Sequence, residues 1–116
     1  MALRKFVERL TKPVEELDRE KLEAWCEQQG TVPLDQVSPR RPVAVAGEVN
    51  SVRIVPRAGA DALEATVQDG RGQVVAVFLG RRHIGGVTPG RRILLEGVVT
   101  TEGRALLMYN PVYTLR

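Results

Sequence analysis

The stretch that decides the fold is "ALEATVQDGRGQVVAVFL", residues 62–79. Residues 62–68 alternate between two faces and residues 73–79 are apolar on both, which is typical of a half-buried strand followed by a central strand. The Asp-Gly pair in "DGRG" between them favours the positive φ angles of a tight hairpin turn. We therefore expect an antiparallel hairpin in which Asp69 accepts hydrogen bonds from backbone N–H groups of its own turn.

The two glycines of this hairpin do not indicate a nucleotide-binding loop. A phosphate-binding P-loop requires Lys and then Ser or Thr after its last glycine, at the start of a helix. Gly72 is followed by an apolar strand, and a dinucleotide-binding fingerprint would need a third glycine at fixed spacing. We therefore expect Gly70 and Gly72 to turn the chain.

The two-residue period continues on both sides of the hairpin. Five strands are expected in all, at residues 43–55, 62–68, 73–79, 92–100 and 105–113. Their connections are expected at residues 56–61, 69–72, 82–90 and 101–104. Gly47 predicts a tight bend in the first strand, and the slip of alternation at Asn50–Ser51 predicts a β-bulge. This strand count and turn chemistry indicate an all-β fold, a small sandwich or barrel.

The N-terminal residues, 1–30, have the period of a helical segment. The first apolar stripe consists of Leu3, Phe6, Val7 and Leu10, and the second of Val14, Leu17, Leu22, Trp25 and Cys26. The second stripe is expected to pack on the following domain or on a second copy of the chain, with Trp25 as a core residue. Gly30 ends this segment, and the prolines of residues 31–42 predict an extended connector to a domain at 43–116.

Charge is distributed unevenly along the 116 residues. Residues 1–39 carry six basic and eight acidic side chains, whereas residues 40–116 carry eleven basic and six acidic ones. All eleven are arginine, which makes forked contacts to phosphate and stacks on bases. A genome rich in G and C would also favour arginine, so both explanations of the arginine excess stay open. The separation of charge favours an anionic partner for residues 40–116.

Several classes of site are not expected. One cysteine, Cys26, and one histidine, His83, form neither an internal disulfide nor a zinc site, and no cofactor motif is present. His83 has no nucleophile or carboxylate in a recognisable pairing, so we expect a loop residue and no enzyme. No apolar run reaches the eighteen or so residues of a membrane span, and the first ten residues lack the apolar core of a secretory signal. These features favour a cytoplasmic protein.

A closed barrel of five strands has one exposed sheet face between the loops that join strands one to two and four to five, and single-stranded nucleic acid commonly lies on this face. The candidate phosphate-binding residues are Arg53, Arg57, Arg71, Arg81, Arg82 and Arg104. Arg53 and Arg57 lie at or near the first loop, and Arg104 ends the second. Arg81 and Arg82 precede a turn whose position relative to this face stays open.

Few aromatic side chains are available for stacking on bases. Phe78 is expected to face inward as a core residue. Tyr109 has the opposite parity to Leu106 and Met108, which are expected to be buried, so Tyr109 is the preferred platform for a base. Tyr113 follows a proline, which indicates an edge or a bulge, and its ring is expected to cover an end of the barrel. We therefore expect modest affinity that is largely electrostatic.

Three segments, "VAVAGEVNSVRIVP", "LEATVQDGRGQVVAVFLGRRHIGGVTPGRRILLEGVV" and "LLMYNPVYTL", together resemble the OB-fold family of nucleic-acid-binding proteins, in its anticodon-binding-like branch. They are most similar to small stand-alone OB-fold proteins of actinobacteria. The wedge module of branch-migration helicases ends with a similar Asn/His-Pro-x-Tyr. The resemblance covers about residues 40–116 and implies a five-stranded Greek-key OB-fold barrel.

In that family the second and third strands and their flanking loops contact nucleic acid. The matching positions of this chain are Arg53, Arg57, Arg71, Val75, Val77 and Arg104. Relatives often carry Thr at the position of Arg71 and Trp at the position of Phe78. The turn of this chain therefore lacks a hydroxyl, and its third strand carries a smaller ring.

The sequence thus predicts a non-enzymatic module that binds single-stranded DNA or RNA with low sequence specificity. The alternative is an OB domain for protein–protein interaction, a subunit or adaptor whose helical N-terminal segment joins it to a second copy or to another protein. Fold alone does not separate these functions. Arginines gathered on one face would favour nucleic acid, and arginines scattered around the barrel would favour the alternative.

Overall fold

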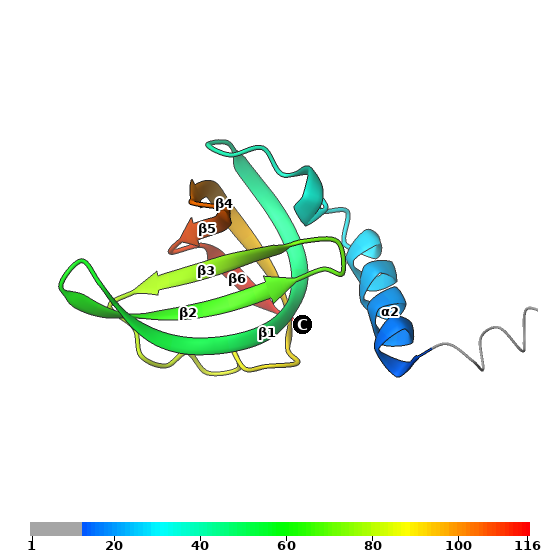
Figure 1. Ribbon diagram of the computed structural model, residues 1–116, viewed down its shortest axis with the longest axis horizontal. Coiled ribbons are helices and arrows are strands. Elements are labelled where there is room, and N and C mark those ends of the chain that lie inside the picture. Colours follow the sequence, from blue (N-terminus) through cyan, green and yellow to red (C-terminus); the bar gives the residue numbers. More distant parts are fainter. Residues whose placement is uncertain (1–12) are drawn as a thin grey trace, which may run out of the picture.

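The computed structural model describes residues 13–116 (Figure 1). In this range the helices are α2 (Val14–Gln28) and the short 3-10 helix η1 (Leu34–Gln36). The strands are β1 (Pro42–Arg57), β2 (Ala60–Gln68), β3 (Gln73–Leu79), β4 (Arg92–Glu102), β5 (Ala105–Tyr109) and β6 (Val112–Leu115). The chain is therefore mostly β, as predicted. The expected first stripe, Leu3 to Leu10, lies outside the described residues.

Five of the strands form a closed ring. They neighbour one another in the order β1-β2-β3-β5-β4, and β4 pairs again with β1. The β3–β5 pair is parallel, and the other pairs of the ring are antiparallel. β1 closes the ring because its residues Pro42–Glu48 pair with β4, while its residues Glu48–Arg57 pair with β2.

The bend and the bulge predicted in β1 are both confirmed. A Cβ on Gly47 would lie 2.5 Å from the backbone oxygen of Gln68 and 2.7 Å from Cγ1 of Val67, so only glycine permits this close approach of β1 to β2. The register shifts between Val49 and Ser51. The irregular residues lie where β1 leaves β4 and joins β2, which is where a strand shared by two partners must bend.

The predicted loop at residues 56–61 is wrong, because β1 and β2 continue to a two-residue turn. Ala58 and Gly59 have φ angles of 50° and 80°, and positive φ at both central residues matches the twist of a tight hairpin. The sequence did not predict this turn, because an alanine at position 58 does not indicate a positive φ angle. In the same way β4 continues to Glu102, so the connection expected at residues 101–104 is also only two residues long.

The single strand expected at residues 105–113 is wrong as well, because it divides into β5 and β6. Asn110 has a φ of 48° and precedes Pro111. The Asn110 backbone N–H donates to the Val77 carbonyl at 2.7 Å, and its Oδ1 accepts from the Leu79 N–H at 2.9 Å. These bonds anchor Asn110 beside the end of β3. After Pro111, β6 continues along the same edge of β4 that β5 occupies, with the register shifted by one residue, while the other edge of β4 pairs with β1.

The apolar core lies inside the ring. It consists of Leu34, Val45, Val49, Leu63, Ala65, Val67, Val74, Ala76, Phe78, Ile84, Val87, Ile93, Leu95, Val99 and Met108. Phe78 faces inward, as predicted, and its ring lies edge-on to that of Tyr113, with centroids 5.6 Å apart. The segment expected at residues 82–90 is a turn without a helix.

Helix α2 packs on the ring of its own chain. Leu22 and Cys26 are buried against Ala46 of β1, and Trp25 is half-buried at the edge of this contact. The guanidinium carbon of Arg92 lies 5.1 Å from the centroid of the Trp25 ring. The second apolar stripe therefore packs on the domain that follows it in the same chain, which is one of the two packing partners expected for it.

The expected connector, residues 31–42, is partly built into the domain. Its residue Leu34 is buried in the core, and the Leu34 N–H donates to Oδ2 of Asp69 at 2.8 Å. Oδ1 of Asp69 accepts from the N–H groups of Arg71 and Gly72, each at 2.9 Å. The role predicted for Asp69 within its own turn is confirmed, and the same carboxylate also holds η1.

Candidate nucleic-acid interface

The candidate interface is the outer face of β2, β3 and β5, which lies between the β1–β2 turn and the β4–β5 turn. Its floor consists of Ala62, Val77 and Leu107, which are buried, and Val75, which is half-buried. These residues have the outward parity of their strands, opposite to Leu63 and Phe78 of the core. Of the two valines that the resemblance implied as contact residues, Val75 thus has exposed surface and Val77 has none.

A buried carboxylate stands on this floor. Glu64 is 2% exposed, and its Oε1 accepts from Nη2 of Arg53 at 3.2 Å while its Oε2 accepts from Nε of Arg57 at 2.6 Å. The register places Arg53 directly opposite Glu64. A charged carboxylate without such partners would be costly to bury. Arg57 is the last residue of β1, next to the β1–β2 turn, and Arg53 lies four residues earlier in the same strand, so both lie at or near this turn as expected.

Arg57 also reaches across the face to β4 and β5. Its Nη1 donates to Oη of Tyr109 at 2.9 Å and to Oε2 of Glu102 at 3.2 Å. The Tyr109 hydroxyl donates to the same Glu102 oxygen at 3.2 Å, and the guanidinium carbon of Arg57 lies 5.7 Å from the Tyr109 ring centroid. We call Arg53, Arg57, Glu64, Glu102 and Tyr109 the Arg57 cluster.

The hydrogen bonds of the cluster favour the charged forms of Arg57 and Glu102. Those from Arg57 to Glu64 and then to Glu102 raise the pKa of Arg57, while burial acts in the opposite direction. The hydrogen bond from Arg57 lowers the pKa of Glu102, and the Tyr109 hydroxyl adds to this effect. The cluster holds two guanidinium groups and two carboxylates, so its formal charge is zero. Arg53 is 74% exposed above the buried Glu64, whereas Glu102, at 58%, is more exposed than Arg57, at 22%.

The other predicted arginines do not extend this cluster into one trough. Arg71 pairs with Asp35 at 3.1 Å, at the end of the β2–β3 hairpin that faces α2 (Figure 1). Arg82 pairs with Asp61, close to the opposite end of β2. Arg104 occupies the β4–β5 turn directly beside the outer face.

Two of the predicted arginines have no carboxylate partner within residues 13–116. Among residues 13–116, neither Arg81 nor Arg104 forms an ion pair. Both are exposed, and Arg81 lies in the loop that follows β3. Arg104 lies in the two-residue turn that follows Glu102 of the Arg57 cluster, so it adds a positive charge at this border of the outer face.

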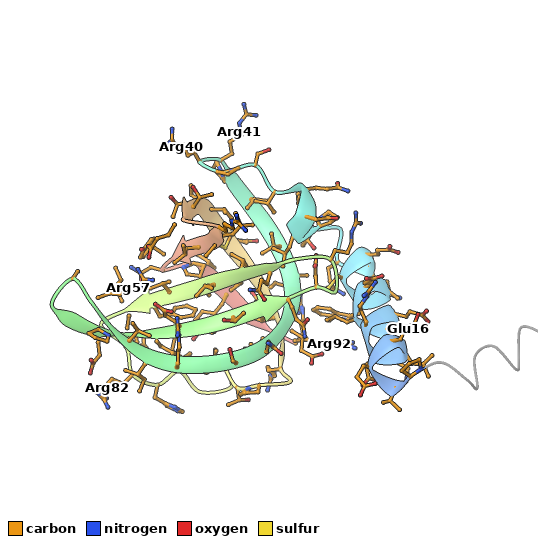
Figure 2. All side chains as sticks on the ribbon, viewed as in Figure 1. Glu16, Arg40, Arg41, Arg57, Arg82 and Arg92 are labelled. Atoms are coloured by element: carbon orange, nitrogen blue, oxygen red, sulfur yellow. The ribbon has the colours of Figure 1, made fainter. Side chains whose placement is uncertain are left out.

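The arginines therefore lie on several sides of the molecule. Figure 2 shows this for the labelled residues: Arg40 and Arg41 lie together at the top, Arg57 and Arg82 lie at the left, and Arg92 lies near α2. By the criterion of arginine distribution, this scatter favours protein–protein interaction, whereas the grouping of three arginines around the outer face favours nucleic acid.

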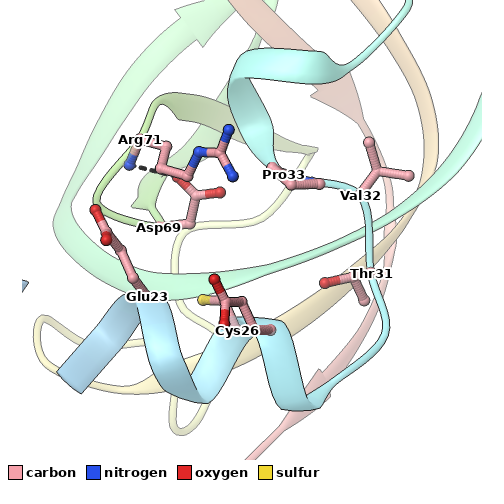
Figure 3. A pocket seen from close by; sticks show the side chains of 8 residues that line it. Glu23, Cys26, Thr31, Val32, Pro33, Asp69 and Arg71 are labelled. Atoms are coloured by element: carbon pink, nitrogen blue, oxygen red, sulfur yellow. Dashed lines mark hydrogen bonds between the residues drawn. The ribbon is translucent and has the colours of Figure 1, made fainter. Parts of the chain in front are cut away.

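A depression separate from the outer face lies between α2, the connector and the β2–β3 hairpin (Figure 3). It has a volume of about 190 Å³ and is lined by Glu23, Cys26, Glu27, Thr31, Val32, Pro33, Asp69 and Arg71. Its most polar groups are already engaged, Asp69 by three backbone N–H groups and Arg71 by Asp35. Burial raises the pKa of the Cys26 thiol to about 11, so the sulfur is protonated at neutral pH. We see no catalytic arrangement in this depression.

Within the described part of the chain, no group of three or more His, Cys, Asp or Glu side chains is placed to hold a metal ion. His83 is exposed in the loop between β3 and β4. No helix in residues 13–116 is long and apolar enough to cross a membrane. No protein-family model matches the chain, and no curated protein matches it.

Proposed function

We propose that the chain is a non-enzymatic OB-fold module that binds single-stranded DNA or RNA on its outer face, with low sequence specificity. The strand order supports the fold: a five-stranded ring in which β1 serves both halves and β3 lies parallel to β5 is compatible with an OB fold. Such barrels bind oligonucleotides on the face of strands two and three and on the loops beside it.

The observation that carries this proposal is the contact of Arg57 with Tyr109. A guanidinium group and an aromatic ring that is 41% exposed lie side by side on the outer face, 5.7 Å apart. Single-strand binders combine cations for the phosphates with rings on which bases stack. Arg53 and Arg104 supply further exposed cations at the borders of this face. Neither kind of contact depends on base identity, so we propose low specificity.

The direct test is a fluorescence-anisotropy titration with labelled oligo-dT and oligo-U of about 12 nucleotides, a length within the site sizes of such barrels. The titration is repeated with a double-stranded oligonucleotide of the same length, and each titration is carried out at several salt concentrations. We expect single strands to bind more tightly than the duplex, and the affinity to fall as salt rises. Absence of binding to every probe in dilute buffer would overturn the proposal.

A matched pair of double variants locates the interface. Arg53→Gln with Arg104→Gln removes two exposed cations beside the outer face, and Arg91→Gln with Arg116→Gln removes two elsewhere. If both cations contact phosphates, the first variant should reduce the log–log salt slope by about 1.4, since each phosphate on a single strand contributes about 0.7. Equal slopes for the two variants would place the binding surface elsewhere.

The second candidate function is protein–protein interaction, which the scatter of the arginines and the position of β6 favour. β6 pairs with β4, and none of residues 13–116 forms a strand on its other edge. Val112 on this strand is 64% exposed. A free edge with an exposed apolar residue can add a strand from a partner. Sedimentation over a wide concentration range tests the homo-oligomer: self-association that Val112→Lys abolishes supports it, and a monomer throughout contradicts it.

A further inference from the structure

The charges around Glu64 do not balance. Arg53 and Arg57 both donate to this one buried carboxylate, so the three residues carry one excess positive charge. The bond from Arg57 is the tighter, at 2.6 Å, and it fixes the guanidinium group on the floor of the outer face. Arg57 is thereby oriented with Nη1 directed away from Glu64 and toward a second anion.

In the free protein that second anion is Glu102. This residue is the last of β4, and its side chain is 58% exposed. Its Oε2 accepts from Nη1 of Arg57 and from the hydroxyl of Tyr109, each at 3.2 Å. Exposed ion pairs contribute little free energy, so Glu102 is held far more weakly than the buried Glu64.

The two donors that hold Glu102 also suit a phosphate oxygen. Arginine binds carboxylate and phosphate groups through the same N–H geometry, and a tyrosine hydroxyl donates to either. The proposed function requires phosphates to reach this face, and the Tyr109 ring beside the donors is the preferred platform for a base. Glu102 and a phosphate of a bound strand therefore compete for one position.

Resting on the proposed function, we propose that Glu102 is an autoinhibitory residue that occupies the position of a backbone phosphate until a single strand displaces it. The bound phosphate then accepts the hydrogen bonds from Arg57 Nη1 and Tyr109 Oη, and Glu102 turns into solvent. Glu64 stays in place and keeps Arg57 oriented. Glu102 thus lowers affinity for phosphodiesters and reduces the number of phosphates that the free face attracts.

The test compares Glu102→Gln with Glu96→Gln. Both variants remove one negative charge from an exposed position on β4 and keep the shape of the side chain. Among residues 13–116, Glu96 makes no ion pair with any arginine. Glu96→Gln therefore reports the general effect of net charge, and Glu102→Gln adds the local effect at Arg57. The probe is labelled oligo-dT of about 12 nucleotides, titrated by anisotropy at several salt concentrations.

We expect Glu102→Gln to bind about two- to fivefold more tightly than Glu96→Gln, because the competing exposed ion pair is worth at most about 1 kcal/mol. We also expect its salt slope to be steeper by about 0.7, the contribution of one further phosphate. Adding Tyr109→Phe to Glu102→Gln should reduce the gain in affinity, since the hydroxyl that would donate the second hydrogen bond to the phosphate is then absent.

Three outcomes separate this proposal from the proposed function. Tighter binding by Glu102→Gln alone supports both. Binding by the wild-type protein with equal affinities for the two glutamine variants overturns the role of Glu102 and leaves the nucleic-acid module intact. Failure of the wild-type protein and of both variants to bind in dilute buffer overturns both.

Discussion

Asp69, at the tip of the β2–β3 hairpin, accepts a hydrogen bond at 2.8 Å from the backbone N–H of Leu34, which lies 35 residues earlier in the chain. The bond joins the 3-10 helix to the hairpin, and Leu34 itself fills one end of the core. The segment between α2 and β1 is therefore a structural part of the domain, and the Asp69 carboxylate is one of the groups that hold it.

Asp69→Ala should lower the free energy of unfolding by about 2–3 kcal/mol. The substitution leaves three backbone N–H groups without their acceptor, and an unsatisfied buried donor costs about 1–3 kcal/mol. Urea denaturation followed by circular dichroism measures the change. Asp35→Ala is the control, because it removes only the exposed pair with Arg71, which is worth at most about 1 kcal/mol. Equal effects of the two substitutions would contradict the role assigned to Asp69.

Gly47→Ala should destabilise the protein by about 1–3 kcal/mol, the usual cost of forcing extra atoms into a packed site. The new Cβ would meet the backbone oxygen of Gln68, which moves only if β1 and β2 separate. Thermal unfolding measures the loss. Gly85→Ala serves as the matched control, because its Cβ would meet no atom within 4 Å, and we expect a change within about 0.5 kcal/mol. A neutral Gly47→Ala would show that the bend of β1 relaxes without cost.

The thiol of Cys26 should react slowly in the folded protein. Burial raises its pKa from 9.0 to about 11, with a further contribution from the charge of Asp69. At pH 8 the thiolate fraction is then about a hundredfold smaller than in the unfolded chain, so reaction with an aromatic disulfide reagent should be slower by at least that factor. The rate should rise with pH up to about 11. Unfolding in urea should restore the ordinary rate, and rapid reaction at pH 8 without denaturant would contradict the burial.

The same shift has a consequence for stability. Because the folded-state pKa of Cys26 lies above that of the unfolded chain, its favourable contribution is complete below about pH 9 and is lost as the pH rises toward 11. Cys26→Ala should flatten the fall in stability over this range, as measured by urea denaturation at fixed pH values. An identical pH profile for the wild-type protein and the variant would show that Cys26 does not titrate differently on folding.

Tyr109→Ala should weaken binding of single strands by about 1–3 kcal/mol if one base stacks on the ring. Tyr109→Phe keeps the ring and removes the hydroxyl that contacts Glu102 and Arg57, so it should retain most of this energy. Anisotropy titrations measure both, and urea denaturation checks that each variant is folded. A loss of stability with unchanged affinity for Tyr109→Ala would make the ring a structural residue.

Much of the fold could be predicted because its signals are local. The alternation of residues 62–68 and the Asp-Gly turn identified the central hairpin, and Gly47 with the slip at Asn50 identified the bent first strand. The proline before Tyr113 indicated an edge or a bulge, but the division of the last strand was not predicted, because it depends on Asn110, whose side chain accepts a hydrogen bond from the end of β3. Such a contact joins elements distant in sequence, and no local pattern indicates it.

The candidate site was only partly predictable for a similar reason. The outward parity of Tyr109 was apparent, but the partners of the arginines were not. Arg57 reaches Glu64 from the end of β1 because the β1–β2 turn has only two residues, whereas a loop at residues 56–61 would have left Arg57 outside the strand. Glu64 shares the outward face of the alternating strand β2 with Thr66 and Gln68, so no local pattern indicated that it would be buried beneath cations.

Because β1 pairs with β4 at one end and with β2 at the other, the architecture has consequences for folding kinetics. Pro42 meets Val98, and β4 is synthesised after most of the chain, so loop closure over a long separation precedes much of the stabilisation. Topologies dominated by such distant pairings fold in milliseconds to seconds, which is slower than helical bundles. During translation the first half of β1 therefore remains an open edge until β4 has left the ribosome, and this interval is when the nascent chain is most exposed to aggregation.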